Sequence, residues 1–141
     1  MQNANTIFAV MQERGKKGLP VERLYRMLFN RDLYLQAYAK LYPNKGAMTP
    51  GSTPETVDGM SIRSIDNIIE AIKYERYQWT PVRRTYIKKT NGKMRPLGLP
   101  TWSDKLLQEV IRSILEPYYE LQFSEHSHGF RPGKGCHSAL M

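Results

Sequence analysis

Hydrophobic residues recur along most of this chain at intervals of three and four, the spacing of one face of an α-helix. Asn30, Ser61 and Ser103 stand where N-caps are expected, because their side chains can accept a hydrogen bond from a free N–H of the first turn. Pro20 suits the first position of a helix, and Pro117 should end or kink one. The pattern predicts helices over residues 3–13, 20–29, 30–42, 61–79 and 103–117, and a last one from about residue 135.

One β-hairpin is predicted where residues 82–89 and 93–99 flank Asn91-Gly92. That dipeptide favours a two-residue type I′ turn, and a three-residue loop with a bulge is the alternative. Pro96 cannot donate a ladder hydrogen bond, so the second strand should lie at an edge. The remaining stretches read as loops: a basic break at 15–18, a Pro- and Gly-rich loop at 43–59 and a polar loop at 122–134. The predicted fold class is α+β and helix-dominated, with several helices and one antiparallel hairpin.

The charge balance predicts a polyanionic partner. Lys and Arg number 21 against 13 acids, which gives a net charge of +8, and no Asp or Glu occurs between Arg76 and Ser103. Solvated surfaces normally mix both signs, so a block without acids favours a surface that faces phosphates. A generically basic protein is the alternative.

The hairpin concentrates this charge. We expect a two-residue turn to place Lys88 opposite Arg95, and a three-residue loop to place Lys89 there. Either pairing puts like charges across from each other, which destabilises a hairpin unless a bound triphosphate or nucleic-acid backbone reverses the interaction. Long side chains that splay into water are the alternative.

Aromatic residues accompany the basic ones: Tyr74, Tyr77, Trp79 and Tyr86. They could stack on bases while Arg and Lys follow the phosphates, or they could pack in a core.

Several other chemistries are excluded. Gly129, Gly133 and Gly135 do not match the spacing of a P-loop around Lys134. The three His residues and the single Cys136 fit no zinc spacing, and His128 is better explained as a packed or hydrogen-bonded loop residue. No pair of acids lies on a predicted strand, and Asp58 and Asp104 should act as helix caps.

No apolar run is long enough to cross a membrane, and the N-terminus lacks signal-peptide features.

Ordered motifs give the sequence a family resemblance over nearly its whole length. They are LYR at 24–26, NKGA at 44–47, VDGMS at 57–61, RPLGLPT at 95–101, DKLLQEV at 104–110 and SHGFRPG at 127–133. In this order they resemble group II intron-encoded reverse transcriptase/maturases of the bacterial, chloroplast-like type. One departure is Gly51-Ser52-Thr53-Pro54, which leaves the shape of the 43–59 loop open.

The resemblance implies an N-terminal helical extension over 1–42 and, over 43–141, the fingers region with the start of the palm of a right-hand polymerase. It implies that the parent protein is an RNA-directed DNA polymerase and intron maturase whose palm acids hold Mg²⁺. Those acids are expected beyond Met141, so this chain is expected to be a truncated piece without catalytic residues, cofactor or polymerase activity. A stand-alone RNA-binding splicing module without polymerase function is the alternative.

The expected partners are group II intron RNA, an RNA template with a DNA primer, and a deoxynucleoside triphosphate (dNTP). The expected location is a ribonucleoprotein in the bacterial cytoplasm, with self-association through the exposed surface that would face the palm. The resemblance assigns Lys89 and Arg95 to the triphosphate. Nucleic-acid contacts are expected from Arg83, Arg84, Lys88, Lys93, Arg131, Lys134, Lys16 and Lys17.

Overall fold

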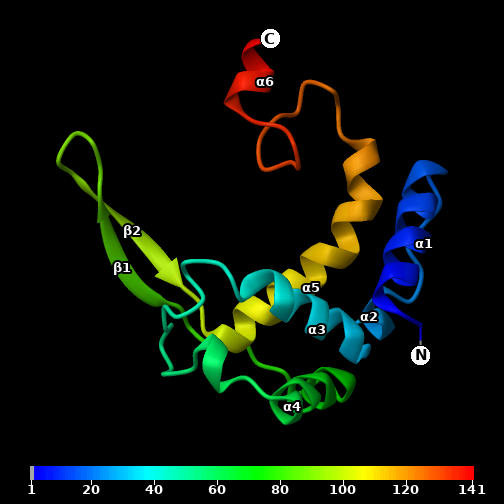
Figure 1. Cartoon of the computed structure of the whole chain (residues 1–141), viewed down its shortest axis with the longest axis horizontal. Helices are drawn as coiled ribbons and strands as arrows, with labels where there is room; N and C mark the ends of the chain where they lie inside the picture. Colours follow the sequence, from blue (N-terminus) through cyan, green and yellow to red (C-terminus); the bar gives the residue numbers. More distant parts are fainter. Residues whose placement is uncertain (1) are drawn as a thin grey trace.

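A computed structural model describes residues 2–141 and shows a helical body from which a two-stranded hairpin projects (Figure 1). In this part of the chain six α-helices accompany a single antiparallel sheet of two strands, which confirms the predicted α+β, helix-dominated class. The elements are α1 (Ala4–Lys16), α2 (Leu24–Met27), α3 (Arg31–Leu41), η1 (Val57–Gly59), α4 (Ile62–Lys73), β1 (Arg83–Lys88), β2 (Met94–Leu99), α5 (Trp102–Tyr119), η2 (Glu120–Gln122) and α6 (Cys136–Leu140).

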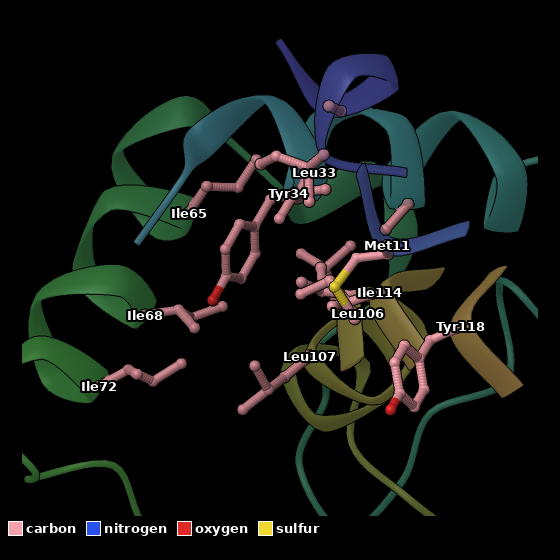
Figure 2. Packing of buried hydrophobic residues seen from close by; sticks show 14 residues of the cluster. Met11, Leu33, Tyr34, Ile65, Ile68, Ile72, Leu106, Leu107, Ile114 and Tyr118 are labelled. Atoms are coloured by element: carbon pink, nitrogen blue, oxygen red, sulfur yellow. The ribbon is translucent and has the colours of Figure 1, made fainter. Parts of the chain in front are cut away.

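Helix α5 is the centre of the body. Its residues Leu106, Val110 and Ile114 are fully buried, at the four-residue spacing that places side chains on one helix face. Helices α1 and α3 pack against it, and α4 contributes a row of isoleucines to the same core (Figure 2). Burying a side chain of this size contributes about 1.5–3 kcal/mol. The apolar stripes read from the sequence therefore all meet at α5.

Segments on both sides of residue 42 belong to this one core. Met11 of α1 and Leu33 and Tyr34 of α3 are fully buried beside the side chains of α5 (Figure 2). The Tyr25 hydroxyl donates to the carbonyl of Ile72, which ties α2 to the end of α4. Residues 2–42 are thus an integral part of the body.

Two predictions for the N-terminal region are wrong. The expected break at 15–18 begins too early, because α1 runs through Gly15 to Lys16. The helix expected over 20–29 is reduced to the short α2, since Arg23 adopts a left-handed φ of 54° directly before it. Pro20 lies outside that helix, where its carbonyl accepts hydrogen bonds from Nε and Nη2 of Arg14 at 3.0 and 2.8 Å.

The bounds of α4 and α5 also differ from expectation. Helix α4 ends at Lys73 rather than near residue 79, and Glu75 turns the chain with a φ of 56°. Thr101, not Ser103, caps α5, because its Oγ1 accepts from the Asp104 N–H. Pro117 does not end α5: the next residue, Tyr118, is buried, and its hydroxyl donates to the Leu19 carbonyl at 2.8 Å.

Gly15 sets the distance between α1 and α5. A Cβ added there would lie 2.2 Å from the backbone oxygen of Tyr118, so no larger residue fits without moving a helix. Gly15→Ala should therefore lower the free energy of unfolding by about 1–3 kcal/mol, the usual effect of overpacking, although alanine favours helix. Urea unfolding measures the change.

Gly46→Ala is the matched control, because a Cβ at Gly46 meets nothing within 4 Å. Its stability should stay within about 0.5 kcal/mol of wild type. Equal stability of the Gly15→Ala protein and the wild type would contradict the close packing of α1 on α5.

Candidate nucleic-acid interface

The tip of the hairpin is a three-residue loop formed by Thr90, Asn91 and Gly92. The Lys89 N–H donates to the Lys93 carbonyl at 2.7 Å, and the Gly92 N–H donates back to the Lys89 carbonyl at 3.0 Å. Of the three loop residues only Gly92 has a positive φ, of 79°. This is the alternative with a bulge, and the type I′ turn is not formed.

The pairing of the strands differs from both expected registers. Arg95 lies opposite Ile87, and Lys88 lies opposite Met94. The predictions that Arg95 faces Lys88 or Lys89 are therefore wrong, because the loop of residues 90–92 pairs Lys89 with Lys93 and so places Arg95 two rungs further, opposite Ile87. Two cations still face each other, since Lys89 and Lys93 form the last rung beside the loop.

This register sorts the side chains of the hairpin by residue number. Paired residues project to the same face and neighbours along a strand to opposite faces. Every pair joins two odd or two even numbers, so the hairpin has an odd face and an even face. Lys89 and Arg95, the expected triphosphate pair, share the odd face. The odd face comprises Arg83, Thr85, Ile87, Lys89, Lys93, Arg95, Leu97 and Leu99, and the even face comprises Val82, Arg84, Tyr86, Lys88, Met94, Pro96 and Gly98.

The positive charge of the hairpin is not neutralised within the described residues. The six cations at 83, 84, 88, 89, 93 and 95 form no ion pair with a carboxylate in residues 2–141. Acids pair instead on the helical body, as Asp66 does with Arg31 at 2.8 Å and Glu109 with Lys40 at 2.8 Å. The hairpin thus presents an uncompensated positive field, which attracts polyanions.

The loop before α4 holds the base of the hairpin. The Arg83 guanidinium donates to the Pro50 carbonyl from Nε at 3.2 Å and from Nη2 at 3.0 Å, and the Ser52 hydroxyl donates to the Pro81 carbonyl at 2.7 Å. Gly51 lies against the backbone of Pro100, where an added Cβ would approach to 2.6 Å. In this structure Arg83, expected to contact nucleic acid, attaches β1 to the body.

A buried carboxylate fixes the segment that leads into β1. Asp104 is 2% exposed, and it accepts from the Tyr77 hydroxyl at 2.6 Å and from the Thr80 N–H at 3.0 Å. Burial and then the bond to Asp104 raise the pKa of Tyr77 well above its usual range. The prediction that Asp104 caps the helix is therefore wrong, because Thr101 caps α5 and Asp104 instead holds the segment before β1. Tyr77 is committed to this bond instead of stacking on a base.

The remaining candidate cations lie away from the hairpin (Figure 1). Lys16 is exposed at the far end of α1, and the neighbouring Lys17 pairs with Glu13 at 3.0 Å. Arg131 is largely enclosed by its own loop, where it bonds to Glu120 and to the carbonyls of Ser124 and Ser127. Lys134 follows it, half-buried, just before α6. The hairpin alone gathers several of the candidates on one element.

One further residue from the sequence analysis, His128, lies in the loop before α6. His128 Nδ1 lies 2.9 Å from the Ser138 hydroxyl, which confirms a hydrogen-bonded loop residue. Over residues 2–141, no helix has the length and apolar character to cross a membrane.

Comparison with known proteins identifies the family, although no family model matches the chain. It is 54% identical over 119 residues to the group II intron-encoded protein LtrA of Lactococcus lactis, a match that covers 84% of this chain and 20% of LtrA. An uncharacterized 91 kDa protein in the cob intron of Schizosaccharomyces pombe is 52% identical over 134 residues, 92% of this chain and 17% of that protein. Nuclear intron maturase 1 of Arabidopsis thaliana mitochondria is 26% identical over 129 residues, 77% of this chain and 18% of the maturase.

The fold and the cationic hairpin thus occur in a sequence whose relatives are intron proteins. The chain belongs to the group II intron-encoded proteins and intron maturases, which confirms the resemblance carried by its motifs. It spans about a fifth of the length of the Lactococcus relative, so it corresponds to a segment of such a protein.

The bond between Tyr77 and Asp104 should stabilise the attachment of the hairpin. Tyr77→Phe removes it and should lower the free energy of unfolding by about 1.5–3 kcal/mol, the usual range for a hydrogen bond to a charged group. The raised pKa of Tyr77 adds a pH dependence. Above pH 10, the ordinary pKa of a tyrosine, the Tyr77 hydroxyl loses its proton in the unfolded state but keeps it in the folded state. The stabilisation is thus complete below pH 10 and declines above it.

Urea unfolding at pH 8 and pH 11 measures both effects. The stability difference between wild type and Tyr77→Phe should shrink at the higher pH. Tyr74→Phe is the control, because Tyr74 is 58% exposed. If Tyr77→Phe lowers the free energy of unfolding at pH 8 no more than Tyr74→Phe does, the role of this bond is contradicted.

Proposed function

We propose that this chain is the segment of an intron-encoded reverse transcriptase and maturase that binds RNA and the triphosphate of an incoming deoxynucleotide. The observation that carries the proposal is the hairpin, whose six cations have no carboxylate partner among the described residues. Like charges side by side are tolerated at a cost that bound phosphates would remove. Family membership supports intron RNA or an RNA template as the polyanion.

The odd face supplies the triphosphate site in this proposal. Lys89 and Arg95 lie diagonally on it, with Lys93 directly across from Lys89. Their side chains project from an exposed hairpin tip, so a triphosphate can reach all three. Neutralising phosphate charge in this way would lower the cost of bringing a nucleotide to a nucleic-acid end.

Catalysis is assigned to the larger protein. Polymerases of this class hold Mg²⁺ with acids, but among residues 2–141 no three His, Cys, Asp or Glu side chains are placed to hold a metal ion. The residues present do not fit a catalytic Mg²⁺ site. We therefore propose that this segment binds and orients substrates, with residues 1–42 as an extension built into the body of the fingers.

The proposal places the segment in a ribonucleoprotein with intron RNA. The proposal also includes self-association of the segment, because apolar side chains are exposed in the C-terminal part of the chain. These are Leu121, Phe123, Phe130, Leu140 and Met141.

RNA binding by the 141-residue chain should depend strongly on salt. Each phosphate contact to a single strand contributes about 0.7 to the slope of log affinity against log salt concentration. The triple variant Lys88→Gln, Lys89→Gln and Lys93→Gln should therefore reduce the slope by about 2. Fluorescence anisotropy with a labelled single-stranded RNA, from 50 to 300 mM salt, measures it.

The control changes the same net charge on α4 and the turn after it, through Arg63→Gln, Lys73→Gln and Arg76→Gln. It should leave the slope close to that of wild type. Equal slopes for the two triple variants would assign the binding to net charge and contradict an interface on the hairpin.

Triphosphate binding should depend on the two odd-face residues Lys89 and Arg95. Displacement of a fluorescent dNTP by unlabelled dTTP should be weakened several-fold by Lys89→Gln or Arg95→Gln, and left unchanged by Arg63→Gln. Labelled dTTP should not be incorporated on a primed RNA template, because the segment carries no catalytic acids. Unchanged displacement in both variants would remove the triphosphate role, and incorporation that survives purification controls would contradict the inactive segment.

A further inference from the structure

The even face of the hairpin carries an exposed aromatic residue that the proposed function does not use. Tyr86 is 57% exposed, between Val82 at 55% and Met94 at 56% on the same face. No other aromatic ring and no hydrogen-bond partner engages Tyr86 within the described residues. Its neighbour Ile87, on the odd face, is 37% exposed. Exposed apolar side chains gathered on one face are typical of a binding surface.

Contacts with the body involve the odd face. Arg83 donates to the Pro50 carbonyl, and Leu99 lines a cavity together with Ala47 and Trp102. On the even face, the three atoms nearest to an added Cβ at Gly98 all belong to the side chain of Val82, whose Cγ2 would lie 2.8 Å away. The two faces therefore differ in what surrounds them, and the even face remains open.

Pro96 lies directly across from Tyr86 on the even face. Hydrogen-bonded and non-hydrogen-bonded pairs alternate along an antiparallel ladder. The rung of Lys89 and Lys93 is hydrogen-bonded, and Tyr86 faces Pro96 three rungs away, so that rung is non-hydrogen-bonded. The missing N–H of Pro96 thus costs no ladder bond, and the side chains of such a rung lie close together. An aromatic ring and a proline ring form one apolar platform.

Two cations flank this platform. Arg84 and Lys88 lie two residues before and after Tyr86 on the same face, each about 7 Å away along the strand. The two cations are thus about 13 Å apart, roughly twice the separation of consecutive phosphates in an extended single strand, so each can meet a phosphate on its own side of a stacked base. No acid occurs between residues 76 and 103 to compete for the two cations. An apolar or acidic protein partner would use either the platform or the charges, whereas a single-stranded nucleic acid uses both.

We propose that the even face binds single-stranded nucleic acid, with one base stacked on Tyr86 and phosphates on either side of that base at Arg84 and Lys88. This inference rests on the proposed function, in that the segment must bind nucleic acid at all. It adds a second surface, back to back with the triphosphate residues on the odd face. A hairpin used in this way would hold a strand on one side and a nucleotide on the other.

Photo-crosslinking at adjacent positions tests the face directly. A benzophenone amino acid replaces Tyr86 in one protein and Ile87 in another, and each is irradiated with labelled oligouridine and with labelled oligothymidine. Position 86 should give crosslinks at least several-fold more abundant than position 87. Equal yields at the two positions would overturn the assignment to the even face. A preference for one oligonucleotide identifies the strand as RNA or DNA.

Affinity measurements test the stacking. Tyr86→Ala should weaken binding of the single strand roughly 5- to 100-fold, the usual effect of losing one stacked base, whereas Tyr86→Phe keeps the ring and the affinity. Ile87→Ala is the control on the odd face and should bind like wild type. The double variant Arg84→Gln and Lys88→Gln should lower the salt slope by about 1.4, with dNTP displacement unchanged.

The outcomes separate this inference from the proposed function. A wild-type chain that binds no single strand overturns the proposed function. Binding by wild type that Tyr86→Ala leaves intact overturns only the even-face site. A blunt duplex that competes as well as a single strand also overturns it, because a duplex offers no free base to stack. Thermal unfolding of each variant verifies the fold, and crosslinking at position 86 provides an independent result.

Discussion

The carboxylate of Asp104 connects the helical body to the hairpin. It lies in the first turn of α5, where the helix dipole and free N–H groups favour a negative charge. Its oxygens accept from the Tyr77 hydroxyl and from the Thr80 backbone. A buried carboxylate without a cation is tolerated only when hydrogen bonds satisfy it. This requirement draws residues 77–80 to α5 and determines where β1 begins.

The hairpin depends on such anchors because it buries little surface of its own. Every residue of β1 and β2 is exposed or partly exposed. An isolated two-stranded hairpin is marginal in water. Its orientation is therefore maintained at the base, by the bonds of Arg83 to Pro50 and of Ser52 to Pro81. Its tip, which carries Lys88, Lys89, Lys93 and Arg95, forms no side-chain hydrogen bond or ion pair with the body in residues 2–141.

Much of the helical body could be predicted from the sequence, because apolar spacing alone identifies the faces that meet at α5. The errors arose where a contact distant in sequence overrides a local preference. Gly15 reads as a helix breaker until Tyr118 is placed against it, and Asp104 reads as a cap until Tyr77 reaches it. For the candidate site, the acid-free stretch indicated the element on which the structure gathers cations without carboxylate partners among residues 2–141. The partners of Arg95 and the attachment of Arg83 depend on loop length and on Pro50, which no local pattern specifies.

The loop of Thr90, Asn91 and Gly92 determines the composition of both hairpin surfaces without taking part in either. A two-residue turn would have paired Lys88 with Arg95 and carried Arg95 to the side of Tyr86, mixing the charges of the two faces. The observed loop keeps them apart, with the Asn91 side chain accepting from the Lys93 N–H at 3.1 Å. Changes at these exposed tip residues can therefore exchange which chemistry each side of the hairpin displays, while every strand residue stays the same.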